Sequence, residues 1–145
     1  MSVMIHRHRA AQSVIDRFSG RAFAWGKVDC ASLAAHNLHN LGIACPFMKG
    51  AKYRTERGAV DHLASLGFTS LIAAVDGLGL TRIPPAMAVM GDLIGLPGAG
   101  DCWDVALTVA VGNGRVIGIQ GGFCSPLQPD LSQALAAWRC EPCRK

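Results

Sequence analysis

Hydrophobic positions in the first half of the chain recur at helical spacing. Apolar residues between Ala11 and Phe18 share one face of a predicted helix, which Ser19 and Gly20 end. The next apolar run is preceded by the N-cap residue Asp29 and followed by a glycine, and it predicts a helix that begins at Cys30. Two further segments have the same start and stop signals. The predicted helices span residues 10–18, 30–41, 55–66 and 70–75.

The pattern changes to that of strands after Pro84-Pro85, which excludes regular structure at that point. Asn113-Gly114 between two apolar runs is a strong hairpin signal. The predicted strands span residues 92–96, 105–112, 115–120 and 123–128, and 131–138 is expected to be a short helix or a closing segment. Helices followed by an antiparallel sheet predict the α+β class.

The length of 145 residues predicts one domain, residues 1–145, able to bury a core. It divides into a helical half of about 9–83, a sheet half of about 87–128 and a closing segment of 129–145. No secretory signal is recognised, and the most apolar stretch, 105–111, is too short to span a bilayer, so synthesis in the cytoplasm without membrane insertion is expected. Only 17% of residues are charged, which suggests a surface partly covered by a partner.

Charge is concentrated in the first part of the chain. Residues 1–57 hold nine Lys/Arg and three acidic residues, a net charge of +6, whereas residues 58–145 carry −2. Such a basic half favours an anionic partner. However, the sequence has no basic run and little aromatic interleaving, so it predicts a solvated or protein-facing surface rather than nucleic-acid binding.

Cys30 is the clearest candidate for a reactive residue. At a helix start, unpaired amides and the helix dipole favour a thiolate; Lys27 would act in the same direction and Asp29 would oppose it. The alternative is that Cys30 is a small apolar residue packed under the sheet.

Several segments together resemble a known family. Phe23-x-Trp25-Gly26-x-x-Asp29-Cys30 resembles the nucleophile segment of NlpC-type cell-wall peptidases, Gly91–Ile94 is similar to their next strand, and Val105–Ile117 is similar to their central hairpin. The resemblance implies a papain-like fold with Cys30 as nucleophile. It leaves two functions open, an active peptidoglycan peptidase or amidase and a degraded homologue.

The chain length, Ile83-Pro84-Pro85 and Ala136-Ala137-Trp138-Arg139 are similar to a small branch of that family encoded by phages, prophages and gene-transfer agents. This resemblance implies other tail-tip or baseplate proteins as partners, with peptidoglycan as a further possible partner. It also implies final assembly into a virion or phage-like tail particle.

The family's catalytic histidine opens the first hairpin strand. Aligned on Gly112-Asn113-Gly114, that position falls on Ala106, or on Asp104 in a longer register, and the orienting position falls on Gly118, with Gln120 the nearest polar residue. Asp104 is expected to cap a strand edge or loop instead, because a carboxylate is a poor base towards a thiol.

The aromatic residues Trp25 and Trp103 would line the groove beside Cys30, or seal the core, which is the expectation for Trp25. The chain's histidines are not expected to serve as the base. His36 and His39 lie ~9 and ~13.5 Å along the same helix from Cys30. His62 lies on another helix, and His6 and His8 are expected in a flexible end.

Six cysteines without an export signal argue against a disulfide framework, so most are expected to be buried or free thiols. Cys140-x-x-Cys143 could form a four-thiolate metal site only with the distant Cys102 and Cys124. A flexible reduced end is the simpler interpretation, and no cofactor is predicted.

Overall fold

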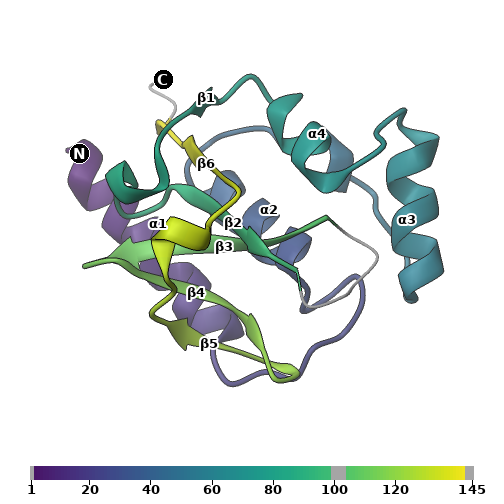
Figure 1. Ribbon diagram of the computed structural model, residues 1–145, viewed down its shortest axis with the longest axis horizontal. Helices are drawn as coiled ribbons and strands as arrows, with labels where there is room; N and C mark the ends of the chain where they lie inside the picture. Colours follow the sequence, from purple (N-terminus) through teal and green to yellow (C-terminus); the bar gives the residue numbers. More distant parts are fainter. Residues whose placement is uncertain (1, 99–103, 143–145) are drawn as a thin grey trace.

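The computed structural model describes residues 2–98 and 104–142, in which helices come first and strands follow (Figure 1). The helices are α1 (Val3–Phe18), α2 (Cys30–Asn40), α3 (Glu56–Ser65) and α4 (Leu71–Asp76). The strands are β1 (Thr81–Arg82), β2 (Leu93–Pro97), β3 (Val105–Gly112), β4 (Arg115–Gln120), β5 (Phe123–Leu127) and β6 (Ala136–Arg139). Short 3-10 turns lie at η1 (Pro46–Met48), η2 (Pro85–Met87) and η3 (Leu131–Gln133). No helix among the described residues is both long and apolar enough to cross a bilayer.

The strands form one six-stranded sheet in the order β1-β6-β2-β3-β4-β5, and every pairing is antiparallel. This arrangement confirms the predicted α+β class with helices before an antiparallel sheet. The last strand, β6, does not lie at an edge but between β1 and β2. The sheet is therefore completed only when the end of the described chain is in place.

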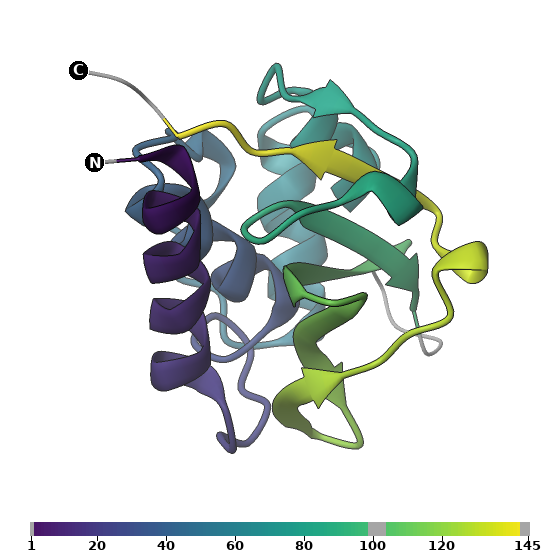
Figure 2. The ribbon, with the colours of Figure 1, turned by 90° about the vertical axis from the view of Figure 1, so that its left-hand side faces the viewer.

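Helices α1 and α2 pack on one face of the sheet and form the main core with it (Figure 2). Val14 of α1, Leu33 and Leu38 of α2, and Leu107 of β3 are all fully buried there. On the facing strand, Val105, Leu107 and Val109 belong to this core, as the alternation of a strand requires. Burial of these aliphatic side chains is the main favourable contribution to folding.

The opposite face of the sheet carries a smaller core. Ile94, Ala110, Val116 and Ala137 are buried in it, against apolar residues near η2 and in η3. Alternate residues of the same strands thus point to opposite faces of the sheet. The position of a predicted site residue within its strand therefore decides which face it occupies.

Most local predictions are confirmed. Asp29, Thr55 and Ser70 each accept a main-chain hydrogen bond as N-cap residues of α2, α3 and α4. The predicted hairpin is present, with Asn113 and Gly114 at φ values of 57° and 73°, as a tight two-residue turn requires.

The first helix was predicted too short. It begins at Val3 rather than near residue 10, because Ser2 caps it and Arg7 is buried on its inner face with only 2% exposure. A buried arginine interrupts the apolar pattern, so the start of the helix could not be recognised from the sequence. The expectation that His6 and His8 lie in a flexible end is therefore wrong.

Of the two alternatives for 131–138, the short helix is wrong. This segment is a 3-10 turn followed by β6, and Ala136, Ala137 and Trp138 are all buried. A strand enclosed on both faces lacks the alternation of a half-buried strand, so its sequence carried no strand signal. The two-residue strand β1 was not predicted either.

Candidate functional site

Cys30 is the first residue of α2, as the sequence predicted, and the turn before it is built around Asp29. The Asp29 carboxylate is fully buried and accepts hydrogen bonds from the amides of Ser32 (2.7 Å) and Gly26 (2.8 Å) and from the Tyr53 hydroxyl (2.8 Å). Asp29 therefore has a structural role, because its oxygens organise the loop before α2.

Gly26 makes the tight approach of this turn possible. Its φ is +80°, and a Cβ there would collide with the main-chain oxygen of Tyr53 and approach the Arg54 guanidinium to 2.9 Å. The segment 24–29 is thus held from one side by Tyr53 and from the other by the start of α2, which fixes the position of Cys30.

The Cys30 thiol lies inside the protein, with a residue exposure of 8%. Burial raises its pKa from 9.0 to about 12; the Asp29 charge adds to the increase, and a hydrogen bond from the Leu107 main chain opposes it only in part. A thiol with this pKa is almost entirely protonated near neutral pH, so it is a poor nucleophile.

The side chains that β3 presents to the helices are apolar. Cys30 shares its core with Val105, Leu107 and Val109, whereas Ala106 stands opposite Leu96, which packs in the core of the other face. The register that placed Ala106 opposite the sulfur is therefore wrong by one residue, because Ala106 has the parity of the far face. Asp104 lies before β3, and its carboxylate hydrogen-bonds the start of α4 instead.

The predicted orienting residues lie on the far face as well. A Cβ at Gly118 would meet Thr108 Cγ2 at 2.7 Å, and Thr108 stands opposite Ile94 of the smaller core. Gln120 has the same parity as Gly118 in β4 and is exposed. The structure thus brings none of Asp104, Ala106, Gly118 and Gln120 to Cys30.

Asp104 contacts the start of a helix, whereas the sequence suggested that it caps a strand edge or a loop. Its Oδ1 accepts a hydrogen bond from the Leu71 amide at 2.8 Å, so it stabilises the first turn of α4. Trp25 is half-buried against the main core and lies edge-to-face on Phe23, with ring centroids 4.8 Å apart. Trp103 lies outside the described residues.

Three histidines have partners of their own. His6 Nε2 donates to the main-chain oxygen of Asn40 (2.9 Å), His36 Nε2 lies 2.9 Å from Ser13 Oγ, and His62 lies 2.5 Å from the main-chain oxygen of Phe47. These three side chains are half-buried. In the described part of the chain, no imidazole hydrogen-bonds the Cys30 sulfur.

The cysteines do not form the weakly indicated metal site. Cys124 on β5 and Cys140 after β6 are separated by four strand spacings, about 19 Å, which no single metal ion spans. Cys102 and Cys143 lie outside the described residues. Cys30, Cys45, Cys124 and Cys140 are free thiols, and no group of three potential metal ligands occurs among the residues that the structure describes.

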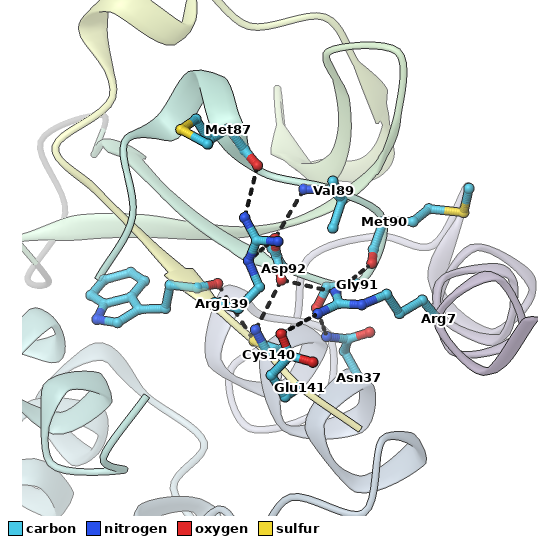
Figure 3. A network of polar contacts seen from close by, with 11 residues as sticks. Arg7, Asn37, Met87, Val89, Met90, Gly91, Asp92, Arg139, Cys140 and Glu141 are labelled. Carbon is cyan, nitrogen blue, oxygen red and sulfur yellow. Dashed lines mark hydrogen bonds and ion pairs between the residues drawn. The ribbon is translucent and has the colours of Figure 1, made fainter. Parts of the chain in front are cut away.

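Sequence reasoning missed the main polar cluster, which surrounds Asp92 (Figure 3). Asp92 Oδ1 is 2.9 Å from Arg7 Nη1 and accepts the Cys140 amide at 2.9 Å, while Oδ2 accepts the Val89 amide at 2.9 Å. Arg139 Nε lies 3.3 Å from Oδ2, near enough for ionic attraction although its N–H is not directed at the oxygen.

This cluster, the Asp92 clamp (Arg7, Asp92 and Arg139), joins three distant segments. Arg7 also donates to the Met90 main chain at 2.8 Å, and Arg139 donates to the Met87 main chain at 3.0 Å. Helix α1, the segment before β2 and the end of β6 therefore converge on one carboxylate with 0% exposure. The only sequence signal was Gly91-Asp92 before an apolar strand, because the two arginines are remote in sequence.

The comparisons with known proteins give one match. A family model described as "Domain of unknown function (DUF6950)" matches residues 4–140. The chain belongs to this family. No curated protein and no solved structure matches it.

The DUF6950 match runs from the first turn of α1 to the residue after β6. It thus includes Cys30 with its capped turn and all members of the Asp92 clamp. Chemically, the described residues of this DUF6950 domain offer a buried, protonated thiol and a buried charge cluster whose oxygens are already engaged.

Proposed function

We propose that this DUF6950 domain is a papain-like, NlpC-type homologue without peptidase activity, which serves as a structural or docking component of a phage-type tail tip or baseplate. The fold class and the capped Cys30 at the start of α2 are compatible with this ancestry. The buried thiol supports the loss of catalysis.

The observation that carries the proposal is the environment of the Cys30 sulfur. A peptidase requires a nucleophile, a base and an orienting group in contact with one another. Here burial raises the thiol pKa to about 12, and the strand side chains on the same side of the sheet are Val105, Leu107 and Val109. Among the described residues, no base is in place to activate the sulfur towards a substrate.

Hydrolysis of purified murein peptides tests this part of the proposal. The native protein, Cys30→Ala and Cys45→Ala are incubated with the peptides, and products are followed by mass spectrometry. We expect equal, background-level turnover from all three proteins. Turnover that is lost in Cys30→Ala but kept in Cys45→Ala would establish the peptidase instead.

The second candidate function is that peptidase, a cell-wall enzyme or amidase that uses Cys30. The position of Cys30 at the helix N-terminus favours it, since helix amides stabilise a thiolate. It would require α2 and β3 to separate enough to expose the sulfur, and iodoacetamide labelling of Cys30 in the folded protein would detect such opening.

Assembly is tested separately from catalysis. After synthesis in the cytoplasm, the chain is expected in purified virions or phage-like tail particles, in fixed proportion to tail-tip or baseplate proteins measured by quantitative mass spectrometry. A chain that is absent from particles and monomeric with every tail-tip protein offered would contradict the structural function.

A further inference from the structure

Two adjoining hollows follow the boundary between α1 and α2, on the outer side of the molecule. One is lined by His6, Arg9, Ser13 and Asn40, and the other shares Arg9 and Ser13 and continues to Arg17. Their volumes are about 410 and 620 Å³, enough for several side chains of a bound segment. We call this surface the α1–α2 groove.

The groove is cationic and rich in histidine. The residues that line it include Arg9, Arg17, His6, His8 and His36, and the exposed His39 lies nearby on α2. Asp16 is the acidic residue in the lining, and Gln12 already donates to its Oδ1 at 2.8 Å. Permanent positive charge thus lies beside His36, an imidazole that gains charge as the pH falls.

Asn40, which lines the groove, carries an unused hydrogen-bond donor just beneath its surface. The side-chain nitrogen of Asn40 is buried and has no partner among the described residues. A buried amide without an acceptor is costly, and a carboxylate oxygen entering the groove would satisfy it after a small side-chain rotation. His6 already contacts the main chain of the same residue, so the position of Asn40 is fixed.

We propose that the α1–α2 groove binds an acidic, extended segment of a partner protein, and that binding strengthens as the pH falls. The inference goes beyond the proposed function, because the groove follows the outer side of α1 and the later turns of α2, away from Cys30, and does not depend on its chemistry. Carboxylates complement the arginines and histidines and supply the acceptor that Asn40 lacks.

An acidic protein fits this groove better than a nucleic acid. Nucleic-acid sites combine many phosphate contacts with exposed aromatic side chains on which bases stack. The lining contains no aromatic residue other than histidine, and Asp16 lies between Arg9 and Arg17 in the sequence of α1.

Protonation of His36 is the expected cause of the pH dependence of binding. Burial, Arg17 and His39 lower its pKa, and Ser13 and the Phe18 ring complete its surroundings. Bound carboxylates offset the two neighbouring positive charges, so they favour protonated His36 and are bound more tightly when it is protonated.

Fluorescence polarisation of a labelled octa-aspartate peptide tests the proposal in low salt. Aspartate stays ionised down to about pH 5.5, so a pH effect in this range reports on the protein. We expect the affinity to rise about fivefold or more between about pH 7.5 and about pH 5.5. His36→Gln should reduce this increase.

The charge requirement is tested with a matched control. Arg9→Gln with Arg17→Gln should weaken binding at least about fivefold, whereas Arg57→Gln, on α3 at the other side of the molecule (Figure 1), should change it less than about twofold. Equal affinities for these variants, or no peptide binding, would overturn the proposal. So would tighter binding of an oligothymidylate of equal charge.

A second measurement needs no substitution. Titration of the isotope-labelled native protein with the octa-aspartate peptide should shift amide resonances along α1 and the second half of α2. Shifts concentrated on the sheet or on α3 would place the peptide elsewhere and contradict the proposed site.

Discussion

The Asp92 carboxylate joins three segments that are far apart in the sequence. It is completely buried and balances Arg7, which is 2% exposed, while Arg139 adds a second positive charge at 3.3 Å. A buried carboxylate between cations stabilises a fold only while all partners are present, because removing one leaves an uncompensated buried charge.

Asp92→Asn should therefore lower the free energy of unfolding by about 3–5 kcal/mol. The amide keeps the size of the side chain but removes the buried anion beside Arg7, which then has only the exposed Glu141 carboxylate at 3.8 Å. Urea denaturation followed by circular dichroism measures the effect. Asp130→Asn, at an exposed carboxylate that caps η3, should change stability by less than ~0.5 kcal/mol. Equal midpoints for the two variants would contradict the role of the clamp.

Because the Cys30 thiol is buried, we expect the free energy of unfolding to decrease at alkaline pH. Burial raises the pKa of the thiol from 9.0 to about 12 in the folded protein, so the unfolded chain releases the proton first as the pH rises. Its contribution is complete below pH 9.0 and declines towards about pH 12. Melting temperatures between these limits should fall less steeply for Cys30→Ala than for the native protein, and parallel curves would refute the assignment.

At the scale of elements, the N-cap residues of the helices differ in how many hydrogen bonds they accept. Ser70 satisfies the amide of Ala73 at the start of α4, as an ordinary N-cap does. Asp29 caps α2 and also accepts the Gly26 amide and the Tyr53 hydroxyl. The second cap therefore connects a helix, a turn and a loop.

Asp29→Ala should cost more than Ser70→Ala. We expect about 1 kcal/mol for Ser70→Ala, the usual value for a lost cap. Asp29→Ala should cost about 2–4 kcal/mol, because Tyr53 and Gly26 would also lose their acceptor inside the protein. Chemical denaturation of both variants checks the ranking, which a similar loss in each would exclude.

Some of these elements could be predicted from the local sequence alone. α2, α3, α4 and the β3–β4 hairpin were predicted because their caps and turn residues act within a few positions of the chain. β6 was missed because what makes it a strand is its place between β1 and β2, and pairing partners far away in sequence leave no local pattern.

At the scale of the whole molecule, the elements differ in how firmly they are held. β3 is central in the sheet and packs against α1 and α2, whereas α3 buries only Ala59 and Leu63 and lies at the periphery (Figure 1). Regions with few buried apolar contacts open locally at a lower free energy than the core.

Amide hydrogen exchange should reveal this difference. Amides of α3 are expected to exchange through local opening, at least about tenfold faster than those of β3, which require global unfolding. Mass spectrometry of peptic fragments, or NMR, measures the rates. Equal protection in α3 and β3 would show that the molecule opens only as one unit.

The sequence by itself determined the α+β class, the capped helix that begins at Cys30 and the hairpin at Asn113-Gly114. Each depends on interactions between near neighbours or on a simple order of elements. Only the tertiary structure decided which sheet face each strand residue occupies, and so that Ala106, Gly118 and Gln120 point away from Cys30. It also decided that Arg7 and Arg139 meet at Asp92, because parity, burial and long-range charge pairing arise only when distant segments pack together.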